Sequence, residues 1–319
     1  MKHYVVGIDL GGMSAKGAIF EENGTLILKK SVPTSSADGF DKTAEHMAEL
    51  TRALAKEAHA DYSEIDGIGI AVPGFIDSEK GVVMRWSNYG WLERPLVQKM
   101  EELTGKKVKI SNDANVAALG EAKFGAGKEY KSSLLVTLGT GVGGGIIVDG
   151  KLLEGYKSAG AEIGHMVICE GGELCSCGRH GCLEAYTSAR ALIRMTKWKM
   201  ELDLTTKMWE VAGGKLENVD GKTAFSAARL GDTRAQEVVD EYVEHLAVGL
   251  ANLANVLRPQ AILLGGGISN EGEHLFAPLR KAVEKKLYAS AEFVPLVITK
   301  ASLGNDAGVY GAFALAKGI

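Results

Sequence analysis

The chain has 319 residues, of which 46% are hydrophobic and 24% are charged, and its formal net charge at pH 7 is −4. This composition is typical of a soluble globular protein with one large or two ordinary domains, and no Lys/Arg run supplies a nucleic-acid-binding surface. No apolar stretch reaches the roughly 20 residues of a membrane span. The N-terminal sequence has no signal-peptide pattern, so we expect a cytosolic protein without a membrane partner.

The first third of the chain predicts strands followed by a helix. Residues 4–33 are expected to form three strands, interrupted at Gly11-Gly12 and at Asn23-Gly24, and Asn-Gly is a strong hairpin signal. Residues 40–58 carry apolar side chains at helical spacing. The sequence IDGIGIAVPG then predicts a buried strand that ends at Pro73-Gly74.

The middle of the chain repeats this order. KVKISNDANVAALGEAKFG (residues 107–125) predicts a strand, a polar break at Asn112-Asp113 and a helix of small residues. Residues 132–155 again predict a strand, a glycine-rich turn, a strand, a turn and a strand. Because a sheet of hairpins followed by a helix and a strand occurs twice, the sequence predicts two related α/β domains.

The C-terminal third predicts a long helix, a buried strand and a closing strand-helix unit. Residues 233–257 have apolar side chains along one helical face, and Pro259 ends the helix. AILLGGGI (261–268) is a buried strand that runs into glycines, and residues 295–318 predict a final strand, a loop and a helix.

Three glycine-rich turns follow predicted strands, at Gly11-Gly12, Gly139–Gly145 and Gly265–Gly267. Glycine lets backbone amides approach phosphate oxygens closely. One such turn is more often a tight turn without a ligand, but three favour a nucleotide site. GTGVGG matches a dinucleotide-binding pattern, yet a strand follows where that motif needs a helix. A Walker A loop ending at Gly221-Lys222-Thr223 fails because Leu216 stands at its first glycine.

All four cysteines lie between residues 169 and 182. A disulfide pair, a reactive thiol and a metal site are the possible explanations, and structural disulfides are rare in the cytosol. Cys175, Cys177 and Cys182 with His165 form a set of four ligands suited to tetrahedral zinc. Spacing alone also allows an all-cysteine set with Cys169. The plain alternative is four reduced cysteines that cluster, but C-x-C…C with glycines favours zinc.

Eight segments in chain order carry a family resemblance: GIGIAVPGFID, SNYGW, NDANVAALGE, LGTGVGGGIIVDGKLL, AEIGH, CSCGRHGCLEAY, LLGGGIS and LGNDAG. Together they closely resemble the ROK family of repressors, open reading frames and sugar kinases, over nearly the whole chain. The early IDLGG and the later TLGTGVGGG resemble the paired phosphate loops of the sugar kinase, actin and heat-shock ATPase superfamily.

The resemblance implies a fold of two related ribonuclease H-like, actin-like ATPase domains with a nucleotide and sugar cleft between them. We expect a smaller N-terminal α/β domain of residues 1–113 plus 306–319. Residues 114–305 are expected to form a larger α/β domain that carries a structural zinc site.

The resemblance also implies an ATP-dependent, glucokinase-like sugar kinase that uses Mg²⁺, with the 6-hydroxyl of glucose or a close relative as acceptor and Asp113 as general base. It assigns sugar contacts to Gly74, Asn88, Asn112, Asp113, Glu162, His165 and Glu184. It assigns nucleotide and metal contacts to Asp9, Gly11, Gly12, Gly139, Thr140, Gly141, Gly265, Gly266, Gly267 and Asn305. The zinc ligands are His165, Cys175, Cys177 and Cys182, with Cys169 as a packing residue.

Three of these positions have plainer alternatives, and one further residue departs from the pattern. Asp113 can be explained as a helix N-cap, for which Asp and Asn are favoured, and Asn88 and Thr140 can be explained as turn residues. The family usually has Thr where this chain has Met13. Ser14 would point to the opposite face of a strand, so one phosphate contact is in doubt and another phosphoryl donor is possible.

Other substrates and another class of protein stay open. The sugar could be an amino sugar (N-acetylmannosamine or N-acetylglucosamine), fructose, allose or a β-glucoside. A non-catalytic sugar sensor is the alternative from another class of protein. The sugar-sensing repressors of the family, however, carry a helix-turn-helix domain before the kinase-like part. In this chain the first predicted strand of that part already starts at Tyr4. The resemblance further implies a homodimer or a dimer of dimers.

Overall fold

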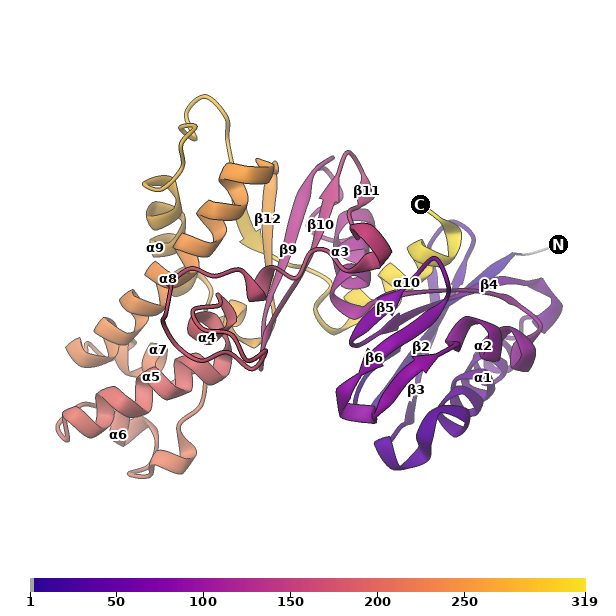
Figure 1. Ribbon diagram of the computed structural model, residues 1–319, viewed down its shortest axis with the longest axis horizontal. Helices are drawn as coiled ribbons and strands as arrows, with labels where there is room; N and C mark the ends of the chain where they lie inside the picture. Colours follow the sequence, from indigo (N-terminus) through magenta and orange to yellow (C-terminus); the bar gives the residue numbers. More distant parts are fainter. Residues whose placement is uncertain (1–2) are drawn as a thin grey trace. The chain divides into compact units, whose positions relative to one another are not determined.

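The computed structural model describes residues 3–319, which separate into two compact units (Figure 1). The first unit contains the described residues up to 131 together with residues 145–161 and 302–319, and the second contains residues 132–144 and 162–301. These bounds differ from the expected division at residues 113 and 306. The reason is that α3 (Asp113–Phe124) packs on α10 (Ala307–Lys317) within the first unit.

The first unit is built on a five-stranded sheet with the order β3-β2-β1-β4-β8. Its strands are β1 (Tyr4–Leu10), β2 (Ser14–Glu21), β3 (Leu26–Pro33), β4 (Ile65–Val72) and β8 (Lys107–Asn112). The first three form antiparallel hairpins, whereas β4 and β8 continue the sheet in parallel from β1. β1 and β4 are almost continuously buried, as expected for strands covered on both faces.

Helices cover both faces of this sheet. The helices of the first unit are α1 (Gly39–Glu57), α2 (Leu96–Thr104), α3 and α10. α1 and α2 share a core with the face of β1 that carries Ile8, and α10 covers the face that carries Val5. Gly7 allows close packing there, because a Cβ atom would lie 2.3 Å from the Val309 carbonyl oxygen. Side chains alternate along a strand, so Asp9 faces α10.

A small three-stranded sheet also belongs to the first unit and was not predicted from the sequence. It consists of β5 (Phe75–Asp77), β6 (Val82–Trp86) and β7 (Trp91–Arg94). The 3₁₀ turn η3 (Ser87–Tyr89) joins β6 to β7. Trp86 stacks on Tyr89, with ring centroids 3.8 Å apart, and Trp91 packs edge-on against both rings.

The second sheet has the same order as the first, β11-β10-β9-β12-β13. Its strands are β9 (Ser133–Leu138), β10 (Val142–Val148), β11 (Lys151–Leu152), β12 (Ala261–Gly265) and β13 (Val297–Lys300). β10 and β11 are antiparallel, and β12 is parallel to both β9 and β13. The predicted repeat of strand order is therefore present.

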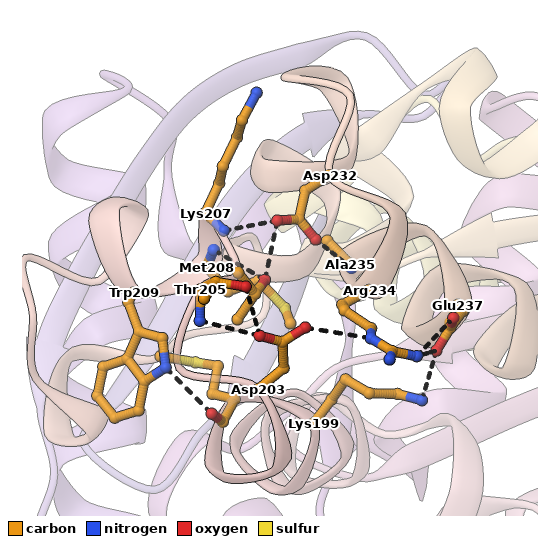
Figure 2. Close-up of polar contacts among 12 residues, drawn as sticks. Lys199, Asp203, Thr205, Lys207, Met208, Trp209, Asp232, Arg234, Ala235 and Glu237 are labelled. Atoms are coloured by element: carbon orange, nitrogen blue, oxygen red, sulfur yellow. Dashed lines mark hydrogen bonds and ion pairs between the residues drawn. The ribbon is translucent and has the colours of Figure 1, made fainter.

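The second unit is rich in helices, and none of the helices in residues 3–319 is long and apolar enough to cross a membrane. The helices of the second unit are α4 (Glu184–Thr187), α5 (Ala189–Leu202), α6 (Met208–Val211), α7 (Thr223–Arg229), α8 (Thr233–Leu257) and α9 (Glu273–Glu284). α8 has the predicted bounds. Figure 2 shows its start, where Asp232 accepts hydrogen bonds from the amides of Ala235 and Lys207 and from the Thr206 hydroxyl.

Candidate functional site

The candidate residues of the first unit gather at one edge of its sheet. β1, β4 and β8 are parallel neighbours, so their carboxyl ends meet at the same edge. Asp9 lies near the end of β1, Gly74 follows β4, and Asn112 ends β8. In open α/β sheets this edge is where ligands commonly bind.

Asn112 and Asp113 lie at the junction of β8 and α3. The Oδ1 atom of Asn112 accepts hydrogen bonds from the amides of Ala114 (3.0 Å) and Asn115 (3.3 Å), so Asn112 is the N-cap of α3. Its Nδ2 atom donates to the Gly74 carbonyl at 3.0 Å. Asp113 is the first residue of the helix, where the helix dipole favours a carboxylate. The Oδ1 atom of Asp113 also accepts a hydrogen bond from the Ala114 amide, at 2.9 Å, so both side chains contact the N-terminus of α3.

Asp9 is a partly buried carboxylate against the first turn of α10. A Cβ atom at Gly308 would lie 2.5 Å from its Cγ atom, so a glycine is needed there. Burial raises the pKa of Asp9, and the positive charge of Lys16 partly offsets this shift. A bound cation would favour the ionised form of such a carboxylate.

The turn after β1 is open to solvent. Gly12 is exposed and the side chain of Met13 is 85% exposed. The Gly11 amide donates to the Ser14 carbonyl at 2.9 Å, which closes the turn. Asn88, in η3, is also exposed.

Two glycine turns of the second unit lie at one end of the second sheet. Gly139–Gly141 connect β9 to β10, and residues 265–267 follow β12, which is the parallel neighbour of β9. Gly266 has φ of +82°, and a Cβ atom there would lie 2.4 Å from the Leu138 carbonyl oxygen. The Thr140 carbonyl accepts a hydrogen bond from Arg190 Nε at 3.0 Å.

Glu184 connects the first of these turns to the cysteine-rich loop. Its Oε2 atom accepts a hydrogen bond from the Val142 amide at 3.0 Å, and a Cβ atom at Gly141 would lie 2.5 Å from that oxygen. Its Oε1 atom accepts from the Ser176 hydroxyl at 2.5 Å. Glu162, by contrast, is exposed, just before the 3₁₀ turn η5 (Ile163–His165).

His165, Cys175, Cys177 and Cys182 form one cluster, in which one ligand atom from each lies within 4.8 Å of the others. Around tetrahedral zinc, neighbouring S and N ligand atoms lie roughly 3.5–3.8 Å apart. Cys177 Sγ and Cys182 Sγ are 3.7 Å apart, and Cys175 Sγ lies 3.6 Å from His165 Nδ1. The donor set therefore fits zinc in both chemistry and spacing.

Local contacts shape this cluster. Gly181 has φ of +81°, and a Cβ atom there would lie 1.8 Å from the Cys169 carbonyl oxygen. Arg179 Nη2 donates to the His165 carbonyl at 2.7 Å. Cys169 lies outside the cluster, so the all-cysteine set is not the one assembled in the described residues. All four thiols are free.

Sequence reasoning did not single out four residues that hold these segments in place: Thr34, Tyr89, Ser176 and Arg190. Each donates a hydrogen bond to a candidate residue or to its turn. These donors are separated in the sequence from the groups that accept their hydrogen bonds, so no local sequence pattern marks them. Tyr89 does lie inside the SNYGW segment.

The two sheets of equal order, each with glycine turns at the carboxyl ends of parallel strands, define an α/β protein of the actin-like ATPase fold. The ROK family profile matches residues 5–319, so the chain belongs to the ROK family.

Several known proteins are similar over the whole chain. A glucokinase from Halalkalibacterium halodurans is 39% identical, over 98% of this chain and 95% of its own. The crystal structure of a ROK family glucokinase from Streptomyces griseus, in complex with glucose and AMPPNP, has a TM-score of 0.79 at 33% identity and covers 99% of this chain and 100% of that one. The ROK hexokinase of Thermus thermophilus has a TM-score of 0.84 at 33% identity, over 98% of both chains.

Proposed function

We propose that this protein is an ATP-dependent glucokinase that transfers the γ-phosphoryl group of ATP to the 6-hydroxyl of glucose. The observation that carries this proposal is that Asp9, Gly74, Asn112 and Asp113 gather at the carboxyl ends of the parallel strands of the first sheet. Asn112 makes the cap and holds the Gly74 carbonyl, and the Asp113 carboxylate stands at the helix N-terminus beside the edge that also carries Asp9. Full-length similarity to glucokinases supports the same activity.

In the proposed mechanism Asp113 accepts the proton of the attacking sugar hydroxyl as that oxygen bonds to phosphorus. Phosphoryl transfer otherwise needs positioning and neutralisation of charge on the phosphates. By the family resemblance, sugar hydroxyls would be oriented by Gly74, Asn88, Asn112, Glu162, His165 and Glu184. Backbone amides of Gly11 and Gly12 and of the turns at 139–141 and 265–267 would hold the nucleotide.

Asp9 is the residue proposed to act near Mg²⁺. Hard cations prefer oxygen ligands, and burial makes the Asp9 carboxylate a group that gains from a nearby positive charge. When bound, the ion would neutralise phosphate charge.

We propose that His165, Cys175, Cys177 and Cys182 hold a structural zinc ion. The short contact from Cys175 is to Nδ1 of His165, so Nε2 is the nitrogen that would carry the proton. A metal-bound imidazole has a fixed ring and tautomer, and His165 could then donate to a sugar hydroxyl. The Ser176 hydroxyl donates a hydrogen bond from the same loop to Glu184. This bond would hold the two proposed sugar contacts, His165 and Glu184, in fixed positions relative to each other.

The activity is tested by ADP release from ATP and Mg²⁺ across a panel of glucose, other hexoses, N-acetylated amino sugars and β-glucosides. Turnover with glucose above all others is expected. Stronger turnover with another sugar would reassign the substrate, and release of ADP with none of them would favour the sugar sensor or another phosphoryl donor, which inorganic polyphosphate in place of ATP would detect.

The role of Asp113 has its own test. Asp113→Asn should keep the glucose Kd within about threefold and lower kcat by at least about 10²-fold, because the amide cannot accept the proton. Asp61→Asn is the matched control, since Asp61 is another carboxylate at the start of a short helix of the first unit, η2 (Tyr62–Glu64). Turnover of Asp113→Asn near that of the control would remove Asp113 from the role.

We further propose a cytosolic homodimer or dimer of dimers, on the strength of the family resemblance. Analytical ultracentrifugation of the purified protein would test the assembly, and a monomer at micromolar concentration would refute it.

A further inference from the structure

Three consecutive carbonyl groups of the turn after β1 accept hydrogen bonds from two residues, Thr34 and Tyr89. The Thr34 hydroxyl donates to the Gly11 carbonyl at 3.3 Å, and the Tyr89 hydroxyl donates to the Gly12 carbonyl at 3.2 Å. The Thr34 amide donates to the Met13 carbonyl at 3.1 Å. The Tyr89 hydroxyl also lies within donor distance of Thr34 Oγ1, at 3.1 Å, so its one proton is shared between that oxygen and the Gly12 carbonyl. Thr34 and Tyr89 together thus contact all three carbonyls.

This arrangement fixes where the amides of the turn point. In a planar trans peptide unit the C=O and N–H bonds point in opposite directions. Holding the carbonyls of Gly11 and Gly12 therefore aims the next amides, those of Gly12 and Met13, away from Thr34 and Tyr89. That side of the turn is open, since Gly12 is exposed and the Met13 side chain is 85% exposed. Backbone amides aimed outward from a turn are suited to phosphate oxygens.

Tyr89 is a firm anchor for the turn. Its side chain is buried, and its ring is stacked on Trp86 at an interplanar angle of 6° and packed edge-on against Trp91 at 89°. Such packing restricts the ring, so the place of the Tyr89 hydroxyl follows the backbone of η3 and its aromatic neighbours. Thr34 is also buried, so water does not readily replace either hydroxyl.

The same short turn also carries a proposed sugar contact. Asn88 and Tyr89 are neighbours in η3, which closes with Gly90 in the left-handed conformation and a hydrogen bond from its amide to the Ser87 carbonyl at 3.2 Å. Asn88 points to solvent while Tyr89 points into the core. A ligand that fixes Asn88 would therefore also fix the backbone that positions Tyr89.

We infer that Tyr89, with Thr34, is a positioning residue: its hydroxyl holds the Gly11–Met13 turn in the conformation that binds phosphate and couples this turn to sugar binding at Asn88. The inference rests on the proposed function, because it takes Asn88 as a sugar contact and the turn as a phosphate contact. By linkage, the factor by which sugar strengthens nucleotide binding equals the factor by which nucleotide strengthens sugar binding.

The test measures direct binding of AMPPNP with Mg²⁺, and of glucose, to the full chain by titration calorimetry. In the wild type, glucose should raise AMPPNP affinity at least about fivefold. Tyr89→Phe keeps the stacked ring and removes the hydroxyl. It should leave the glucose Kd within about twofold, weaken AMPPNP binding about three- to tenfold, as for one lost hydrogen bond, and abolish the enhancement by glucose.

Two further variants sharpen the test. Thr34→Val keeps the side-chain shape and the backbone bond to Met13 and should weaken AMPPNP binding in the same way. Tyr62→Phe is the matched control, because it removes a tyrosine hydroxyl of the same unit that lies 3.0 Å from Thr51 Oγ1. It should leave both affinities unchanged.

Wild-type AMPPNP affinity and wild-type coupling in both Tyr89→Phe and Thr34→Val would overturn the inference. Equal weakening of glucose and AMPPNP, with a lower Tm, would also overturn it, since that pattern belongs to a general structural role. Failure of the proposed function is a separate result: it appears as wild-type protein that releases no ADP with any sugar, whereas the dependence of AMPPNP binding on Tyr89 is still measured.

Discussion

A buried carboxylate, Glu121 of α3, should be among the most sensitive positions in the first unit. Its side chain is fully buried, and its two oxygens accept hydrogen bonds from the amides of Ala126 (2.9 Å), Ser302 (3.0 Å) and Leu303 (2.6 Å). The Ser302 hydroxyl is a fourth donor, at 3.3 Å. Glu121 thus anchors the chain where it re-enters the first unit at residue 302.

The cost of Glu121→Ala follows from these contacts. Each of the three amides left without an acceptor costs about 1–3 kcal/mol. The sum is reduced because water can enter the space. We expect a loss of about 3–5 kcal/mol in the free energy of unfolding, towards the lower end of that sum. Glu121→Gln keeps the volume but offers one acceptor oxygen, so its loss should be smaller.

Urea denaturation measures the overall loss, and hydrogen exchange locates it. The amides of Ser302 and Leu303 should exchange much faster in Glu121→Ala. Glu129→Ala is the matched control, because Glu129 is exposed in the same unit. A Cβ atom at Gly125 would lie 2.0 Å from the Glu121 carboxylate, so Gly125→Ala should reproduce part of the loss. Stability and exchange in Glu121→Ala equal to those of Glu129→Ala would refute the reasoning.

Two further predictions concern the second unit. Removing metal with a strong chelator, or replacing Cys182 by Ser, should lower Tm and sugar-dependent ADP release together. Cys169→Ser should change neither. Metal-free protein with unchanged Tm and activity would refute the zinc site. Burial tends to raise the pKa of Asp232, but hydrogen bonds from the Ala235 and Lys207 amides outweigh it and the pKa is lowered. Asp232→Ala should therefore cost about 2 kcal/mol at neutral pH. The difference from wild type should shrink as pH falls from about 4 through the lowered pKa, as measured by urea denaturation at several pH values. A difference independent of pH would contradict this account.

Local patterns predicted the elements best where the signal lies within one element. α8 has the bounds expected from its apolar face and Pro259, and the polar break at Asn112-Asp113 is the junction of β8 and α3. The repeat of strand order was also visible, since each hairpin pair carries its own glycine turn. These features depend on residues a few positions apart, which a sequence displays directly.

Features set by distant contacts were not predictable. β5–β7 have three to five residues each, too few to show alternation. The bounds of the first unit depend on α3 and α10 packing so closely that a Cβ atom at Gly311 would lie 1.7 Å from the Val116 carbonyl oxygen. No local pattern links residues 116 and 311. The four predicted zinc ligands, in contrast, lie within 18 residues, from His165 to Cys182, and the structure brings them into one cluster.

The contacts of the turn after β1 support the proposal that Met13 is compatible with nucleotide binding. Its carbonyls are held by Thr34 and Tyr89, and neither contact involves the side chain at position 13. The direction of the turn amides is therefore independent of that side chain, which points to solvent. Replacing the family's usual threonine by methionine removes one hydroxyl and leaves the backbone donors, and this argues for retained ATP use by a site that relies on its amides.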